Sequence, residues 1–388
     1  MIELTLGQVA AAVGGRLHRA DGTEKCTGTV EFDTRSVTPG GLFVALPGER
    51  VDGHDFAAAA VEAGAVGVLA AREVDAPAVI VPPADAADAA GSYVLAGDRD
   101  GAGAAVLTAL AALARHVVDN LPALSVVGIT GSSGKTSTKD LVAALLRPLG
   151  PTVAPPGSFN NELGHPWTVL RADAGTRHLV LELSARGAGH IAALCRVAPP
   201  RIGVVLNVGS AHLGEFGSRE AIAQAKGELV EALPADGLAV LNADDPAVAA
   251  MAARTTARVV LAGRAPHADV RATDVTLDPA GRASFVLHAA GTRTPVRLAV
   301  HGEHQVGNAL AAIAVALELG ATPADAAAAL ATAAPVSRWR MEVTTRPDGL
   351  TVINDAYNAN PESLRAALTT LAAMAAAGSH PTAPEPAG

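Results

Sequence analysis

The chain has 388 residues, of which 49% are hydrophobic, 17% charged and 3% aromatic. At roughly 150 residues per domain, this length predicts two or three domains. The hydrophobic content is enough for sizeable cores and excludes a disordered chain. The formal net charge of −9 argues against a nucleic-acid or anionic-membrane surface, so we expect no nucleic-acid partner. Any phosphate must be bound by a local arrangement, because the overall field repels it.

Targeting and redox features are few. No apolar run approaches the roughly 18 residues of a membrane span, and the first residues lack a basic secretory region. We therefore expect a soluble, cytoplasmic chain without membrane insertion. Cys26 and Cys195 lie far apart in the sequence and indicate neither a disulfide framework nor a metal site.

Lysine is rare in this chain. The 29 basic residues include only Lys25, Lys135, Lys139 and Lys226 as lysines. Arginine cannot lose its proton, whereas lysine can, and its compact ammonium fits tight phosphate pockets. A lysine in this chain therefore suggests a position where arginine would not serve; the alternative is an ordinary surface lysine.

The first region, residues 1–98, has the pattern of a small α/β unit. Apolar runs predict strands at 41–46, 66–69 and 79–81, and a helix at 56–62. A stretch rich in Ala, Asp and Pro over 81–97 marks its edge. A helix over 103–120 then leads into the second region.

The second region, residues 99–334, alternates short apolar strands with helical patterns. This alternation predicts parallel βαβ units with both faces of the sheet covered. Strands are expected at 125–129, 178–184, 202–207, 238–242 and 258–261, and helices at 135–147, 219–232, 308–319 and 324–333.

The third region, residues 335–388, holds a predicted strand at 350–354, a helix at 361–375 and a Pro/Ala-rich tail. One strand and one helix cannot bury an independent core. We therefore expect this third domain to be incomplete.

A phosphate-binding loop is the strongest motif. Residues 130–136 read TGSSGKT after a strand and before a helix. In that position glycines turn backbone N–H groups toward phosphate, and the helix N-terminus adds partial positive charge. The strict P-loop pattern has glycine where Ile129 stands, and the alternative is a plain Gly/Ser turn. Within this loop, Lys135 would reach the terminal phosphates and the Thr136 hydroxyl would bind Mg²⁺. The predicted nucleotide-binding residues are Thr130, Gly131, Ser132, Ser133, Gly134, Lys135 and Thr136.

Three further positions can serve the same nucleotide. Glu182 closes an apolar strand, where a carboxylate can hold Mg²⁺ directly or through water, although it can also be a solvated strand-end residue. His212 follows another strand end and can reach the same rim, but a lone His is more often structural. Lys226 lies within a predicted helix and, taken singly, is better read as an exposed lysine paired with a nearby Glu.

Together these pieces resemble the Mur ligase family, the ATP-dependent amide-forming enzymes that build the peptidoglycan peptide. The resemblance runs from residue 1 to about 375. It rests on residues 32–36 (FDTRS), 41–49 (GLFVALPGE), 52–56 (DGHDF), 130–136, 160–164 (NNELG), 207–226, 340–342 (RME) and 354–361 (NDAYNANP). The last string favours the branch that adds D-alanyl-D-alanine over the branch that adds the third residue, and over folylpolyglutamate synthases.

The resemblance implies an α/β protein of three domains. The small N-terminal α/β domain would bind the UDP-sugar, the central parallel-sheet domain would bind ATP, and a Rossmann-like C-terminal domain would follow. The implied reaction activates UDP-N-acetylmuramoyl-tripeptide as an acyl phosphate with ATP and Mg²⁺. The amine of D-alanyl-D-alanine then attacks it. We expect a monomer.

Residue roles follow by matching position. Lys135, Glu182, His212 and Lys226 would be catalytic, and Lys226 matches a lysine that is carbamylated in this family and helps hold a second Mg²⁺. The metal would be held by Thr136, Glu182, His212 and Lys226. The nucleotide would also meet Gln305, Asn308, Arg340, Asp355 and Tyr357. The UDP-muramoyl substrate would meet Thr34, Arg35, Asn160, Asn161, Ser184 and Arg186.

Some positions depart from the family pattern. Ser184 stands where the dipeptide-adding enzymes usually have glycine, and Gln305 replaces a common asparagine. The short third domain is the largest departure, because the family uses that part to complete the ATP site. Two alternatives stay open: the third-residue-adding ligase, and a truncated, non-catalytic module that binds nucleotide or UDP-sugar.

Overall fold

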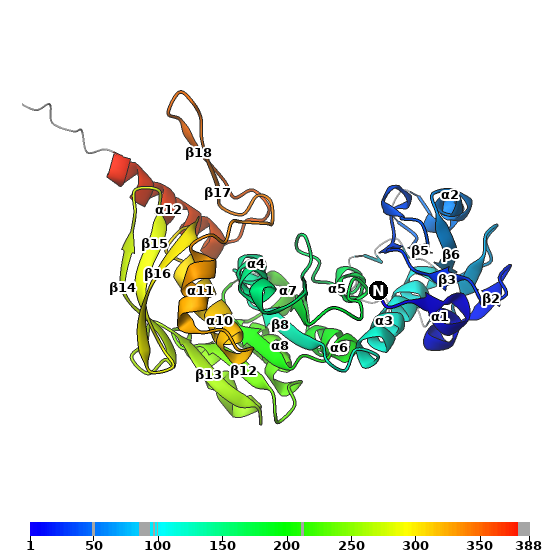
Figure 1. Ribbon diagram of the computed structural model, residues 1–388, viewed down its shortest axis with the longest axis horizontal. Coiled ribbons are helices and arrows are strands. Elements are labelled where there is room, and N and C mark those ends of the chain that lie inside the picture. Colours follow the sequence, from blue (N-terminus) through cyan, green and yellow to red (C-terminus); the bar gives the residue numbers. More distant parts are fainter. Residues whose placement is uncertain (49–50, 85–93, 96–97, 99, 211–212, 379–388) are drawn as a thin grey trace, which may run out of the picture. The chain divides into compact units, whose positions relative to one another are not determined.

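A computed structural model describes residues 1–48, 51–84, 94–95, 98, 100–210 and 213–378. These residues form two compact units. Unit 1 comprises Met1–Val126, Phe159–Leu183 and Ala192–Pro199, and unit 2 comprises Val127–Ser158, Ser184–Ile191 and Pro200–Gly388. Both are mixed α/β structures, as expected, and their elements are labelled in Figure 1.

Unit 1 contains a mainly parallel sheet of strand order β2-β7-β6-β5-β4, in which β2 is antiparallel to β7. The expected strands at 41–46, 66–69 and 79–81 are confirmed with small shifts of their ends. The strands are β2 (Arg16–His18), β4 (Val30–Glu31), β5 (Gly41–Val44), β6 (Ala65–Ala70) and β7 (Ala78–Ile80). Two short strands, β1 (Leu4–Thr5) and β3 (Lys25–Cys26), pair with each other as a separate antiparallel sheet.

The helices of unit 1 begin where the sequence supplies capping groups. Thr5 and Gln8 cap the start of α1 reciprocally, since each side chain accepts the other's backbone N–H. The expected helix over 56–62 is confirmed, with its first residue in a 3₁₀ turn. The elements are α1 (Leu6–Val13), the 3₁₀ turns η1 (Thr34–Ser36) and η2 (Gly53–Phe56), α2 (Ala57–Glu62), α3 (Ala102–Asp119) and α5 (Gly164–Val169). Cys26 and Cys195 are both buried, and the two do not form a disulfide, as expected.

Helix α3 corrects one expectation. It has 18 residues and a mean hydropathy of 1.4, so among the described helices it has the length and composition of a membrane span. We expected no run of that kind. The same 18 residues are 56% buried inside the structure, and α3 packs against α1 and α5. Its apolar character is that of a core helix.

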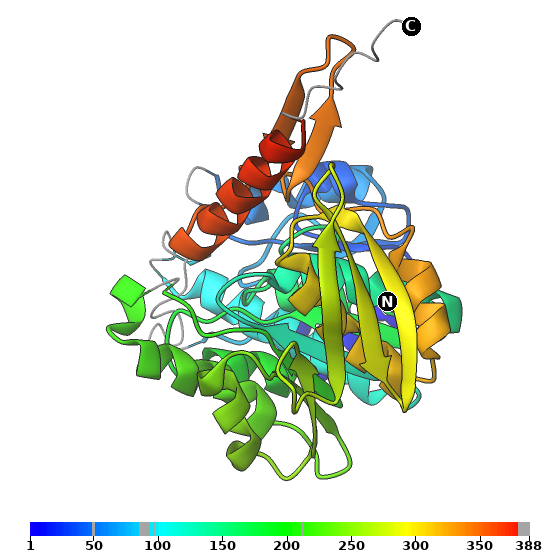
Figure 2. The same ribbon diagram turned by 90° about the vertical axis from the view of Figure 1, so that its left-hand side faces the viewer.

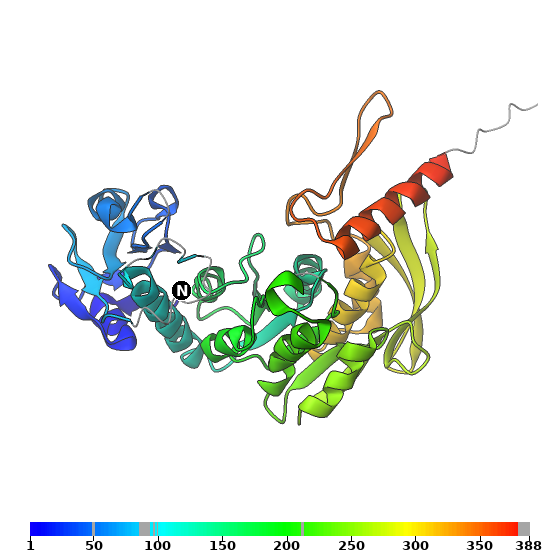
Figure 3. The ribbon, with the colours of Figure 1, turned by 180° about the vertical axis from the view of Figure 1, so that it is seen from behind.

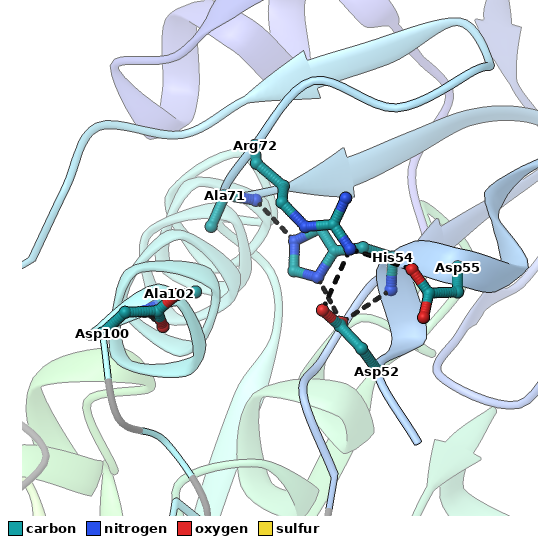
Figure 4. A network of polar contacts seen from close by, with 7 residues as sticks. All are labelled: Asp52, His54, Asp55, Ala71, Arg72, Asp100 and Ala102. Atoms are coloured by element: carbon teal, nitrogen blue, oxygen red, sulfur yellow. Dashed lines mark hydrogen bonds and ion pairs between the residues drawn. The ribbon is translucent and has the colours of Figure 1, made fainter.

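A polar network joins η2 to the end of β6 in unit 1 (Figure 4). The His54 ring is buried; its Nδ1 donates to Asp52 Oδ1 at 2.6 Å, and its Nε2 accepts the Ala71 N–H at 3.0 Å. Arg72 donates to the carboxylates of both Asp52 and Asp55. The DGHDF string therefore serves to fix the turn over residues 52–56 against the sheet.

Unit 2 is organised around parallel strands in the order β13-β12-β11-β8, which confirms the predicted parallel sheet (Figures 1 and 3). These are β8 (Ser125–Thr130), β11 (Ile202–Val205), β12 (Leu238–Asn242) and β13 (Arg258–Gly263). The expected strand over 178–184 is β10 (His178–Glu182), which belongs to unit 1, and β9 (Thr152–Val153) is a short strand of unit 2.

Helices pack against these strands and against one another. Helix α10 lies against α4 and against β12 and β13, while α11 lies against β16. The helices of unit 2 are α4 (Lys135–Leu146), α7 (Leu213–Phe216), α8 (Arg219–Glu231), α9 (Pro246–Ala249), α10 (Gln305–Glu318) and α11 (Pro323–Leu330), with 3₁₀ turns η4 (Arg147–Leu149) and η5 (Ala250–Arg254). Helix α6 (His190–Val197) begins in unit 2 and continues in unit 1.

The expectation of a purely parallel sheet is wrong at one edge. Strands β14 (Val270–Leu277), β15 (Arg282–Ala289) and β16 (Thr292–His301) extend it as an antiparallel ribbon (Figure 2). Gly281 and Gly291 have φ angles of 74° and 71°, and these positive values allow the two tight reversals. Alternate β15 residues are buried, which is the pattern of a strand with one solvated face.

The third region also holds more strand than expected. Besides β18 (Thr351–Asn354), it contains β17 (Glu342–Thr345), which pairs antiparallel with β18 as a projecting hairpin (Figure 2). The chain continues into α12 (Pro361–Gly378), which confirms the helix expected over 361–375.

The Asp52 network predicts an acid-sensitive contribution to stability. Partial burial would raise the pKa of the Asp52 carboxyl, but hydrogen bonds from His54 and Arg72 outweigh it and lower the pKa from 3.8 to about 2. The contribution is therefore present above pH 3.8 and lost as the pH falls through about 2. We expect Asp52→Asn to lower the Tm at pH 7 by about 2–4 °C, and to flatten the fall of Tm in acid.

The control is Asp75→Asn, because the Asp75 side chain is 83% exposed and pairs only at the surface with Arg19. Thermal unfolding followed by circular dichroism at several pH values compares the variants. Equal acid profiles for the Asp52 variant and the parent chain would contradict the assignment.

Candidate functional site

The TGSSGKT loop joins β8 to α4 in unit 2 and has a backbone that requires glycine. Gly131 and Gly134 have φ angles of 158° and 82°. A Cβ on Gly131 would lie 2.9 Å from the Leu206 side chain, and one on Gly134 would lie 2.7 Å from Asn308 Oδ1. Larger residues would push the loop off its neighbours. The turn is thus built to bring backbone N–H groups to the N-terminus of α4.

Lys135 and Thr136 open α4 directly after the loop. The Lys135 Nζ donates to the Gly131 carbonyl at 2.7 Å, so the side chain curls back over the loop. Thr136 is 4% exposed, and its hydroxyl accepts a hydrogen bond from Arg340 Nη2 at 3.2 Å. Both side chains therefore lie where phosphate oxygens and a bound cation would meet this loop.

Asn207, at the end of β11, fixes the middle of the loop. Its Oδ1 accepts the Ser133 N–H at 3.0 Å, its Nδ2 donates to the Ser133 carbonyl at 3.2 Å, and its own carbonyl accepts the Ser132 N–H. The Ser132 hydroxyl in turn accepts the Gly209 N–H at 2.9 Å. Sequence reasoning assigned Asn207 no separate role; its position at the carboxyl end of a parallel strand was the available signal.

The third region contributes a cationic and aromatic group beside Thr136. The Arg340 guanidinium lies 4.2 Å from the centroid of the Tyr357 ring, and its buried Nε has no acceptor among the described residues. Asp355 accepts the Met341 N–H at 3.0 Å. Burial raises the pKa of the Asp355 carboxyl, against the opposing effects of that hydrogen bond and of the Arg340 charge.

A cavity of about 260 Å³ lies over Thr136. Its walls come from the loop after β9 and from the segment that opens the third region. It is lined by Thr136, Pro156, Gly157, Ser158, Val336, Ser337, Arg338, Trp339, Arg340 and Tyr357. The structure thus brings the predicted residues Thr136, Arg340 and Tyr357 together around one space.

Lys226 lies within α8 and is only 5% exposed. The prediction that it is an exposed lysine is therefore wrong. Burial and the nearby charge of Lys135 lower the pKa of Lys226 to about 7. Arg254 crosses α8 at Gly227 and donates to the Ala223 and Gln224 carbonyls. A Cβ on Gly227 would lie 1.8 Å from Arg254 Nη1, so this position requires glycine. The fold therefore holds Lys226 inward and close enough to Lys135 for their charges to interact.

Gln305 and Asn308 open α10, which begins three residues before its expected start. Both are buried, and Asn308 Nδ2 donates to Gln305 Oε1 at 2.9 Å. Because the Asn308 amide lies against Gly134, this pair backs the phosphate loop.

The predicted residues of unit 1 form a second group. Glu182 is fully buried, which excludes the solvated reading, and its Oε2 accepts a hydrogen bond from Asn160 Nδ2 at 3.3 Å. Asn161 Oδ1 accepts the Gly164 N–H at the start of α5. The Arg35 side chain, beside Thr34 in η1, is 87% exposed and pairs with Asp33 at 2.6 Å.

Aromatic contacts around Trp167 connect these unit 1 segments. Its ring lies 6.0 Å from Phe32 and 4.5 Å from Phe159, and its Nε1 donates to the Val30 carbonyl at 2.9 Å. The residues around 34–35 and 160–161 therefore flank one aromatic cluster. Sequence reasoning missed this cluster, although the 3% aromatic content made any such residue informative.

Some predicted residues are not brought into either group. His212 lies outside the described residues. Ser184 and Arg186 lie in unit 2, in a segment whose Gly189 N–H donates to Glu228 Oε1 at 2.6 Å.

Among the predicted metal ligands, Thr136 and Lys226 belong to unit 2 and Glu182 to unit 1. Among the residues that the structure describes, no three His, Cys, Asp or Glu side chains gather as a metal site.

The fold and loop define a nucleotide-binding α/β protein of the P-loop type. Family models match the chain in three places: the Mur ligase family catalytic domain at residues 28–117, the Mur ligase middle domain at 129–316, and the Mur ligase glutamate ligase domain at 339–380. The chain belongs to the Mur ligase family.

Its relatives agree on a branch of that family. The chain is 61% identical to the UDP-N-acetylmuramoyl-tripeptide–D-alanyl-D-alanine ligase of Mycobacterium tuberculosis H37Rv, over 97% of this chain and 74% of that protein. It is 36% identical to the ligase of the same name from Escherichia coli K12, over 96% and 77%.

Solved structures give the same result. The MurF of Acinetobacter baumannii has a TM-score of 0.82 at 32% identity, covering 96% of this chain and 77% of that one. The MurF ligase of Thermotoga maritima, solved in complex with ADP, has a TM-score of 0.73 at 31% identity, covering 89% and 75%. The three-domain Mur ligase fold is thereby confirmed.

The Asn207 contacts predict a test of the loop. Asn207→Ala removes two hydrogen bonds to Ser133, each with a net value of about 1 kcal/mol. We expect ADP binding, measured by calorimetry, to weaken by about tenfold, because a looser loop loses its preorganised N–H groups. Asn120→Ala, at the end of α3, is the control and should leave the Kd unchanged. An unaltered Kd for the Asn207 variant would refute this role.

Proposed function

We propose that this chain is an ATP-dependent, ADP-forming ligase that adds D-alanyl-D-alanine to UDP-N-acetylmuramoyl-tripeptide. This is the last cytoplasmic step in making the peptidoglycan precursor peptide. One observation supports the proposal most: the third region meets the phosphate loop through the Arg340–Thr136 hydrogen bond, in a chain 61% identical to a ligase of that name. Identity to that ligase also favours this acceptor over the third amino acid.

The chemistry proceeds in two steps. A carboxylate oxygen of the tripeptide bonds to the γ-phosphorus of ATP, the bond from that phosphorus to the bridging oxygen breaks, and ADP leaves. The amine of D-alanyl-D-alanine then attacks the acyl carbon and loses a proton, and phosphate leaves as the amide forms. Lys135, the loop N–H groups and Arg340 stabilise the negative charge that moves onto phosphate oxygens.

The residue types assigned by matching position suit Mg²⁺. The Thr136 hydroxyl lies at the mouth of the loop, and a hydroxyl and a carboxylate such as Glu182 are the hard oxygen ligands that Mg²⁺ prefers. We assign Thr136, Glu182 and His212 to holding it. When bound, the ion would neutralise negative charge on the phosphates of the nucleotide.

Lys226 fits a carbamate. Its burial and its lowered pKa of about 7 leave a neutral amine available near neutral pH. That amine can bond to the carbon of CO₂ and release one proton, giving an anionic oxygen ligand for a second Mg²⁺. Arginine, which stays protonated, cannot do this.

We assign the remaining predicted residues by region. Gln305 and Asn308 would face the adenine, and Asp355 and Tyr357 the ribose and phosphates. Thr34, Arg35, Asn160, Asn161, Ser184 and Arg186 would contact the UDP-muramoyl substrate. The domains would be 1–98 for the UDP-sugar, 99–334 for ATP and 335–388 for the start of the C-terminal domain, in a cytoplasmic monomer.

Coupled release of ADP tests this function directly. We expect turnover only when UDP-N-acetylmuramoyl-tripeptide, ATP and D-alanyl-D-alanine are all present. Lys135→Ala should lower kcat by about 100-fold or more, because it removes a charge that stabilises the transition state. Tight ATP binding by the parent chain without any turnover would instead indicate a binding module. Unchanged kinetics of the Lys135 variant would remove the loop from the mechanism.

The carbamate predicts an unusual result for a conservative change. Lys226→Arg replaces one basic side chain by another, yet we expect it to lower kcat by about 100-fold or more, because arginine cannot take up CO₂. Lys25→Arg is the matched control, since Lys25 is an exposed lysine paired with Glu3. Near-normal rates for Lys226→Arg in the same coupled assay would discard the carbamate.

A further inference from the structure

Lys139 is a buried lysine that the proposed reaction does not use. It is fully buried, one helical turn after Lys135 on α4. Its Nζ donates to the Pro155 carbonyl at 2.7 Å and to the Ser337 hydroxyl at 3.1 Å, and it lies 2.6 Å from Asp140 Oδ1. The three acceptors come from three different segments of unit 2.

These contacts explain why the residue is lysine. An ammonium group has three donors around one nitrogen, and here each meets a separate acceptor. A guanidinium spreads its donors over a wider planar fork, which cannot converge on the same point. A buried cation also needs a paired charge, and Asp140 supplies it.

The two segments held by Lys139 are the walls of the cavity over Thr136. Pro155 precedes one wall, residues 156–158, and Ser337 lies in the other, residues 336–340. Asp140 reinforces the second wall, because its Oδ2 accepts the Ser337 N–H at 3.0 Å. Lys139 is thus the group that ties both walls to the helix that bears Thr136.

The second wall has a backbone that would not hold its shape unaided. Trp339 and Met341 have φ angles of 60° and 49°, in the left-handed region that non-glycine residues rarely adopt. Such conformations persist where surrounding contacts impose them. Arg340 lies between these two residues, whose N–H groups donate to Glu342 Oε1 and Asp355 Oδ1. The anchor at Ser337 lies two residues before this stretch.

We propose that Lys139 is a positioning residue. By holding Pro155 and Ser337, it fixes both walls of the cavity and thereby aims Arg340 at the phosphate end of the nucleotide. This inference rests on the proposed function in one respect: ATP supplies the phosphates that Arg340 would contact. The anchoring itself is a property of the chain without substrate.

The test uses one mild and one conservative variant. Ser337→Ala removes a single acceptor and leaves the Lys139–Asp140 pair intact, so it keeps the fold testable if Lys139→Arg fails to fold. Controls are Lys25→Arg, at an exposed lysine, and Thr345→Ala, at an exposed hydroxyl of β17 in the same region. We expect Ser337→Ala to raise the KM for ATP about fivefold and Lys139→Arg at least tenfold, with the KM for the UDP-tripeptide unchanged.

A double-mutant cycle separates positioning from general damage. If Ser337 acts through Arg340, Ser337→Ala should raise the KM for ATP in the parent chain but add nothing in an Arg340→Ala background. Equal effects of Ser337→Ala in both backgrounds would overturn the proposal, and so would a parallel rise in the KM of both substrates.

A readout without turnover keeps this test apart from the proposed function. The chain has two tryptophans, Trp167 in unit 1 and Trp339 in the second wall, so 5-fluorotryptophan labelling gives two ¹⁹F resonances. We expect Ser337→Ala and Lys139→Arg to shift or broaden the Trp339 resonance and leave that of Trp167 unchanged. An unchanged Trp339 resonance in both variants refutes the anchoring, whereas altered resonances in a chain without ligase turnover refute only the function.

Discussion

One face of α4 determines most of what unit 2 can do. Lys135, Thr136, Lys139 and Asp140 follow one another at spacings of one, three and one residues, which places them along the same side of a helix. The first turn presents charge and a hydroxyl at the phosphate loop. The second turn binds the segment that begins the third region, through Ser337. A single helix therefore links the phosphate loop to the segment, residues 336–340, that carries Arg340.

The loop could be predicted from sequence because its physics is local. Glycine positions, a preceding strand and a following helix all lie within about a dozen residues, and the structure has all three. The parallel strands were predictable for the same reason, since each is a short continuous apolar run. The antiparallel ribbon was missed although Gly281 and Gly291 marked its turns, because half-polar strands give a weaker signal than fully buried ones.

The destinations of individual side chains were harder to predict. Lys139 meets Ser337 across 198 positions of sequence, and no pattern around either residue indicates the other. Lys226 looked exposed because glutamates lie near it in sequence, yet the helix is turned so that it is buried. Gly227, the next residue, makes room for Arg254. Because Arg254 lies 27 positions later in the sequence, this contact could not be predicted from the helix alone.

The two buried lysines show how surroundings decide what one residue type does. Lys139 has a carboxylate at 2.6 Å and two further oxygen acceptors, and these contacts make it a structural clamp. Burial lowers the pKa of Lys226 to about 7, and the charge of the neighbouring Lys135, which has the same sign, acts in the same direction. That cation disfavours an ammonium at position 226 but would attract an anion there. A carbamate on Lys226 would therefore be stabilised by the same neighbour that adds to the effect of burial in lowering the pKa of the amine.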